Sequence, residues 1–97
     1  MSTDDFAAEW VQEGTRYVVR GECGGCAVRL TCQVLSLSGR WWWLASVELV
    51  EWEERLWVTM QEGNVCEGLA EAQGEAERRV AGLMAAVFEY VRRGVTA

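Results

Sequence analysis

The chain has 97 residues, and 15 acidic side chains against 9 basic ones give it a formal net charge of -6. It contains no histidine, which excludes Ser-His-Asp catalysis, Cys-His catalysis and zinc sites with histidine ligands. Because 51% of its residues are hydrophobic, a chain of this length is expected to bury one small core in a single domain over residues 1–97.

The start of the chain, MSTDDFAAEW, has neither a basic segment nor an apolar run of signal-peptide length. No stretch of the sequence approaches the roughly 20 apolar residues that a membrane-spanning helix needs. We therefore expect a cytoplasmic protein without a membrane partner.

A short helix is expected over residues 3–13. Thr3 is one of several suitable capping residues, and Phe6 and Trp10 are spaced four apart, as on one apolar face of a helix. Gly14 would end this helix. Through Phe6 and Trp10 it is expected to lie over the open face of the sheet that follows.

Two β-prone runs come next, over residues 15–20 and 26–37. They are joined by GECGGC, whose glycines suit a tight reversal, so the two runs predict a hairpin. In the second run, every second residue is apolar and is expected to face the core: Cys26, Val28, Leu30, Cys32 and Val34.

A third strand is predicted over residues 41–50 after a turn at 38–40, because nearly every residue in it is apolar, as in a central strand. A fourth strand over 55–61 alternates between apolar and polar residues. The Gly63-Asn64 pair that follows it is typical of a turn.

A long helix is predicted over residues 74–93, ending at Gly94. Its apolar face is expected to comprise Ala76, Val80, Leu83, Met84, Val87, Phe88, Tyr90 and Val91. The fold class is therefore α+β, with the order α-β-β-β-β-α: a short N-terminal helix, a single antiparallel sheet of about four strands, and a long C-terminal helix packed on it.

Five of the six tryptophans lie within residues 40–57. Trp41 and Trp43 share one side of the third strand and are expected to fill the core beneath the long helix. The other three are candidate partner contacts, because tryptophan is enriched among interface hot spots: Trp42, Trp52 and Trp57. The alternative is that all six rings pack inside the monomer or a homodimer.

Acid is concentrated in one segment, since residues 48–77 carry nine glutamates and one arginine, a net charge of -8. Such a segment either is a solvated surface that keeps the protein soluble or presents a negative patch to a basic partner. In the second interpretation, the partner-binding acids are Glu51, Glu53, Glu54, Glu62 and Glu67.

These features predict a small, acidic, non-enzymatic protein that binds a basic protein or nucleoprotein complex. The sequence has no phosphate-cradling loop and no spacing that singles out an acid/base pair, so neither an enzyme nor a cofactor is expected. Direct nucleic-acid binding is not expected, because the tryptophans lie among carboxylates. In size and charge only, the chain is similar to some anti-CRISPR proteins, which suggests a bacteriophage or mobile-element inhibitor of a host nucleic-acid-binding complex.

Two other functions stay open. Cys23 and Cys26 have the CxxC spacing of zinc knuckles and dithiol redox sites. However, six residues of strand separate Cys26 from Cys32 by roughly 20 Å, too far for both to bind one ion, so no metal site is expected. The third possibility is a chaperone or assembly adaptor that forms a homodimer through its tryptophan face.

Overall fold

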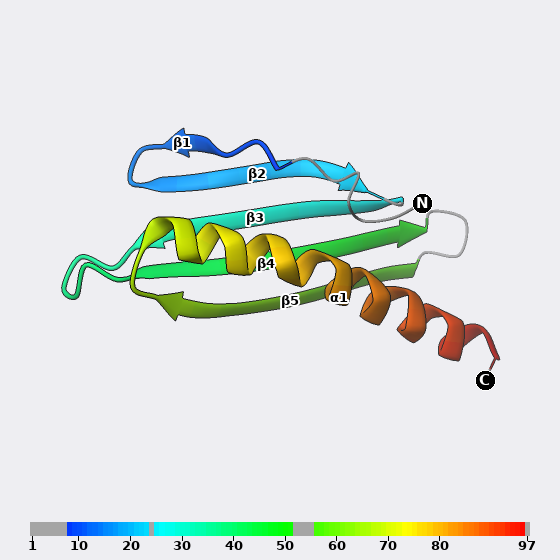
Figure 1. Cartoon of the computed structure of the whole chain (residues 1–97). Coiled ribbons are helices and arrows are strands. Elements are labelled where there is room, and N and C mark those ends of the chain that lie inside the picture. The colour runs from blue at the N-terminus through cyan, green and yellow to red at the C-terminus, as the bar shows by residue number, and fades with distance from the viewer. Residues whose placement is uncertain (1–7, 24, 52–55, 97) are drawn as a thin grey trace.

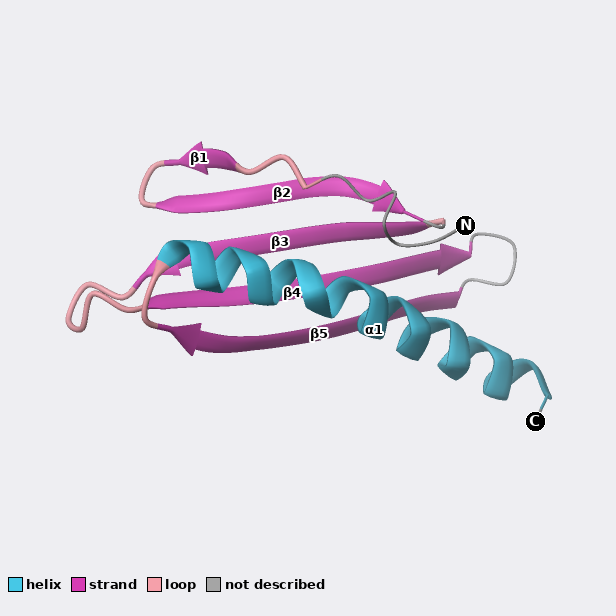
Figure 2. Cartoon of the chain, in the orientation of Figure 1, coloured by secondary structure: helices cyan, strands magenta, loops and turns pink. Residues whose placement is uncertain are grey.

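The computed structural model describes residues 8–23, 25–51 and 56–96. Five strands precede one helix (Figures 1 and 2): β1 (Val11–Glu13), β2 (Arg16–Cys23), β3 (Cys26–Val34), β4 (Trp41–Glu51), β5 (Leu56–Cys66) and α1 (Leu69–Thr96). The α+β class and the long C-terminal helix on an antiparallel sheet are confirmed.

The sheet is an antiparallel meander in which each strand pairs with its neighbour along the chain, in the order β1-β2-β3-β4-β5. The hairpin predicted at GECGGC joins β2 to β3 and places Cys23 opposite Cys26. Gly25 in this turn has a φ of 85°, a left-handed conformation that glycine adopts without strain.

The predicted N-terminal helix is wrong over the described residues, because 8–10 are irregular and 11–13 form β1. Gly14, with a φ of 66°, turns the chain so that Val11 lies opposite Val18 on β2. Backbone pairing with this free edge outweighs the four-residue apolar spacing. Residues 3–7 of the predicted helix lie outside the described residues.

Trp10 lies on the helix side of the sheet, and not over the open face as expected. It packs against the hydrophobic core, and its indole Nε1 donates a hydrogen bond to Glu77 Oε2 on α1 at 3.2 Å. Trp10 therefore closes the core beside the helix.

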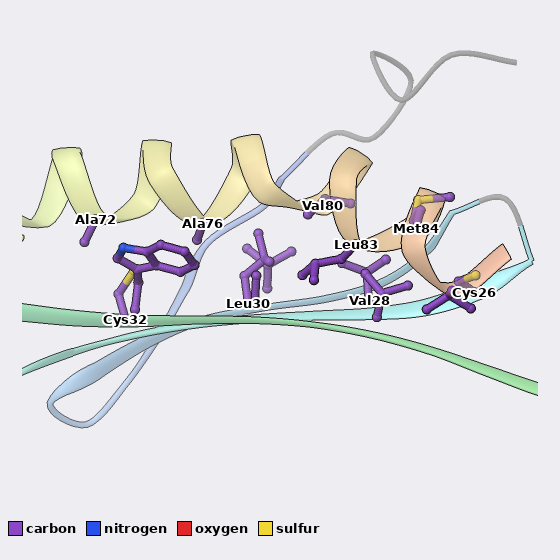
Figure 3. Packing of buried hydrophobic residues seen from close by; sticks show 14 of the residues in the cluster. Cys26, Val28, Leu30, Cys32, Ala72, Ala76, Val80, Leu83 and Met84 are labelled. Atoms are coloured by element: carbon purple, nitrogen blue, oxygen red, sulfur yellow. The ribbon is translucent and has the colours of Figure 1, made fainter. Parts of the chain in front are cut away.

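The core lies between α1 and one face of the sheet. Figure 3 shows Ala72, Ala76 and Val80 of the helix facing the sheet residues Cys32 and Leu30. The two alanines are completely buried, and their small side chains let the helix approach the sheet closely. The alternation predicted for the third strand is confirmed, since Trp43 is buried and Trp41 packs against the core from a half-buried position.

The turn predicted at Gly63-Asn64 is wrong, because β5 continues to Cys66. Gly63 lies opposite Leu44 and Asn64 opposite Trp43, so the ladder with β4 is unbroken. The glycine serves a packing purpose, since a Cβ atom here would lie 2.7 Å from the backbone oxygen of Trp43.

The helix α1 is longer than predicted and extends past the sheet (Figure 1). Its 28 residues span about 42 Å, and Val87 is the last completely buried side chain among those that the structure describes. Phe88 and Tyr90, which were expected on the apolar face, are 43% and 59% exposed, because the helical turn places them at the two edges of the stripe that runs through Val80, Val87 and Val91. No helix among the described residues is both long and apolar enough to cross a membrane.

Candidate interaction face

The second face of the sheet, opposite α1, is called the uncovered face here, because no described element packs on it. Its side chains are the alternate residues that point away from the core, and the strand register aligns them in rows across the sheet. Two adjacent rows carry most of the charge. The basic row consists of Arg20, Arg29, Ser46 and Gln61, and the acidic row of Glu22, Ala27, Glu48 and Thr59.

In the basic row, Arg20 on β2 lies directly opposite Arg29 on β3. Like charges in this position destabilise a sheet. Glu13 on β1 relieves part of the repulsion, since its carboxylate accepts hydrogen bonds from Arg20 Nη1 at 2.6 Å and Nη2 at 3.2 Å. The ion pair between Glu13 and Arg20 passes over Val18 of β2, whose side chain is only 1% exposed.

The arginines change the acidity of this carboxylate. The hydrogen bond from Arg20 is the main cause that lowers the pKa of Glu13, and the positive charges of Arg20, Arg16 and Arg29 lower it further. Among the described residues, Arg16 and Arg29 make no ion pair. One carboxylate thus lies among three guanidinium groups, which leaves this part of the face with excess positive charge.

In the acidic row, Glu22 and Glu48 lie on either side of Ala27. Neither glutamate has an ion-pair partner in the part of the chain that the structure describes. The small alanine side chain leaves space between them. An open hollow of about 570 Å³ extends over both rows and is lined by Arg20, Gly21, Glu22, Ala27, Val28, Arg29, Ser46 and Glu48.

A second, smaller hollow of about 240 Å³ is lined in part by Trp42. Trp42 is half-buried on the uncovered face, which confirms its predicted side of the strand. Its indole lies near Gly63, where a Cβ atom would be 3.6 Å from Nε1. The remaining lining is mainly polar: Arg16, Arg29, Thr31, Gln33, Leu44, Ser46 and Gln61. This volume is below the roughly 300 Å³ at which small-molecule pockets begin.

Two predicted partner-binding acids form ion pairs within the protein. Glu62 is opposite Ala45 on the helix side of the sheet, and its Oε2 lies 2.5 Å from Arg79 Nε. Glu67 lies 3.2 Å from Arg40. Glu62 therefore lies on the opposite face of the sheet from Trp42.

The other predicted contacts are described only in part. Glu51 ends β4 and Trp57 belongs to β5, and their side chains lie outside what the structure describes. Trp52, Glu53 and Glu54 lie outside the described residues.

Sequence reasoning missed the two charged rows, although the hairpin contained the signal for one half of them. Once Cys23 is paired with Cys26, counting back along both strands places Glu22 opposite Ala27 and Arg20 opposite Arg29. The position of Glu48 beside Ala27 depends on the longer β3–β4 connection, whose pairing the sequence did not reveal.

The cysteines belong to the core where they are described. Cys26, Cys32 and Cys66 are buried and form no disulfide, and burial raises the pKa of Cys32 to about 12. The described residues contain no group of three or more His, Cys, Asp or Glu side chains able to hold a metal ion. The side chain of Cys23 is not described, so a Cys23–Cys26 metal or redox pair stays a prediction that metal analysis of a Cys23→Ser variant tests.

Comparison with known proteins adds no family to these observations. No family model matches the chain, and neither a curated protein nor a solved structure matches it.

Proposed function

We propose that the protein is a non-enzymatic binding protein that holds a basic side chain of a protein or nucleoprotein partner between Glu22 and Glu48. The observation that carries this proposal is the acidic row itself. Its two carboxylates lie two strands apart, about 10 Å, on either side of an alanine, and neither is in an ion pair with a described residue.

This spacing suits a guanidinium or ammonium group that enters the hollow and contacts one or both carboxylates. Interactions between charged groups of this kind are strengthened by hydrogen bonds to the ionised oxygens. Ala27 supports the arrangement, since a larger side chain at the centre of the row would fill the space that the partner needs.

Internal ion pairs engage several other acids of the segment 48–77. Glu62, Glu67 and Glu75 form ion pairs with arginines of the same chain. Glu48, in contrast, begins the sequence segment that continues to Glu51, Glu53 and Glu54. We extend the binding surface to these acids as part of the proposal, with a basic surface of a host nucleic-acid-binding complex as the expected target.

The test is capture of partners from a nuclease-treated lysate of a bacterial host with tagged protein and matched variants. The Glu22→Gln/Glu48→Gln variant is expected to lose the partner that the wild type retains. Glu71→Gln removes an exposed carboxylate of α1 and serves as the control that keeps binding. Circular dichroism checks that each variant is folded.

Retention of the same partner by a folded Glu22→Gln/Glu48→Gln variant would overturn the proposed site. Reversal of Glu51, Glu53 and Glu54 to lysine tests the extension separately. It is expected to abolish capture without unfolding the protein.

A further inference from the structure

We infer that the protein also forms a two-fold symmetric dimer in which two uncovered faces meet and Arg29 of each copy enters between Glu22 and Glu48 of the other. This inference rests on the proposed function in one respect, because it assigns the same two glutamates the role of holding a basic side chain. It goes further by naming a second copy of this chain as an occupant.

The register of the sheet supplies the geometry. The basic and acidic rows are neighbours on one face, two residues or about 7 Å apart along the strands. A two-fold axis that lies between the two stacked sheets and parallel to them, perpendicular to the strands and midway between the rows, places each basic row over the acidic row of the other copy. Such an interface is isologous, with the same surface used by both copies.

The strand order makes this superposition specific. The rotation keeps β2 over β2 and β3 over β3 of the second copy, so Arg20 lies over the second copy's Glu22. Arg29 lies over the second copy's Ala27, with a carboxylate on each side. The hollow of about 570 Å³ occupies this place on each face and gives the guanidinium room to enter.

The dimer relieves an unfavourable feature of the monomer. Arg20 and Arg29 are like charges in directly opposed positions, and Arg29 has no ion-pair partner among the described residues. In the dimer, each arginine of the basic row gains a carboxylate from the other copy, and each carboxylate of the acidic row gains an arginine.

The size of the face indicates a dimer of modest affinity. Five strands about 4.8 Å apart, with an average length of about eight residues at about 3.3 Å per residue, present roughly 600 Å² per copy. About 1,200 Å² in total is at the lower end of specific protein interfaces. The dimer is therefore expected to dissociate on dilution, which leaves the acidic row accessible to another partner.

A polyanion is a poorer occupant of the same face. A nucleic-acid strand that follows the β-strands beyond Arg20 and Arg29 reaches Glu22 and Glu48 one row later. The chain as a whole also carries a net charge of -6, which opposes association with phosphates. The alternating basic and acidic rows instead match a partner surface that carries both signs of charge. The uncovered face of a second copy is such a surface.

Sedimentation velocity over a concentration series tests the dimer with two charge-reversed variants. Arg20→Glu/Arg29→Glu is expected to be monomeric, because like charges then face each other, and Glu22→Arg/Glu48→Arg is expected to be monomeric for the same reason. An equimolar mixture of the two variants is expected to form a heterodimer, since positions 20 and 29 of one copy then oppose positions 22 and 48 of the other with opposite charge. Arg78→Glu, on α1 away from the face, is the control that keeps the dimer.

A wild-type protein that stays monomeric, variants that remain dimeric, or a mixture that stays monomeric would each overturn the inference. So would tight binding of a single-stranded oligonucleotide that Arg29→Glu abolishes, because the arginines would then serve nucleic acid. A monomeric wild type whose partner capture still depends on Glu22 and Glu48 removes the dimer and keeps the proposed function. A wild type that forms the dimer but captures its partner independently of these glutamates keeps the dimer and removes the proposed function.

Discussion

Replacement of Gly63 by alanine is expected to destabilise the protein, although alanine is ordinarily tolerated in a strand better than glycine. The added Cβ atom would lie 2.7 Å from the backbone oxygen of Trp43 and 3.3 Å from Leu44 Cδ1. The first of these contacts involves backbone, so β4 and β5 have to move apart. Overpacking of this kind costs typically about 1–3 kcal/mol, which for a domain of this size lowers Tm by about 5–20 °C.

Thermal and urea unfolding followed by circular dichroism measure this effect, with Gly82→Ala as the matched control. No atom lies within 4 Å of a Cβ at Gly82, which is exposed within α1. The same substitution there is expected to stabilise the protein by about 0.5–1 kcal/mol, because alanine favours the helix. A Gly63→Ala variant as stable as the wild type would refute the account of Gly63 as the residue that allows β4 and β5 to approach.

Three further measurements test separate parts of the structure. Burial raises the pKa of Cys32 to about 12. Its thiol therefore stays protonated in the folded protein at pH values at which it ionises in the unfolded chain. The free energy of unfolding should therefore fall above pH 9, by up to about 1.4 kcal/mol per pH unit, and less steeply in Cys32→Ala. In an NMR titration, the pKa of Glu13 should lie below its ordinary value and rise in Arg20→Gln, since the Arg20 hydrogen bond is the main cause of the shift. Val87→Ala should destabilise the protein by about 2 kcal/mol in urea unfolding, and Phe88→Ala by clearly less, because Val87 is completely buried and Phe88 is 43% exposed.

The sheet and the helix side of the core could be predicted from alternation along single strands. Cys26, Leu30 and Trp43 all face α1 as expected, because a residue's side of a strand depends only on its place in the alternation. No pairing partner has to be known for that inference. The prediction that Trp10 lies over the open face of the sheet is wrong, since Trp10 packs beside α1.

Errors arose where a local pattern competed with a contact from another strand. Gly63 carries a turn signal locally, but the long strand β4 continues past it and keeps it in the ladder. In the same way, residues 11–13 belong to a helical apolar pattern, but the free edge of β2 pairs with them. In both places tertiary pairing decided the structure.

The charged rows depend on register between strands, which alternation does not reveal. Arg20, Arg29 and Glu48 come from three strands, and their proximity requires the β2–β3 and β3–β4 pairings together. The net charge summed over residues 48–77 also does not show which acids are free to bind a partner. That sum includes Glu62, although this side chain forms an ion pair with Arg79 of α1.

The order of elements along the chain also affects how the protein is made. The complete sheet precedes α1, so a ribosome synthesises the apolar face that carries Leu30, Trp43 and Val47 before the helix that covers it. At about 5–20 residues per second, the 28 residues of α1 take roughly one to six seconds to add. Until these residues have been added, the apolar face of the sheet has no helix to cover it. The first helix residues to be added include Ala72 and Ala76, whose buried side chains lie against that face.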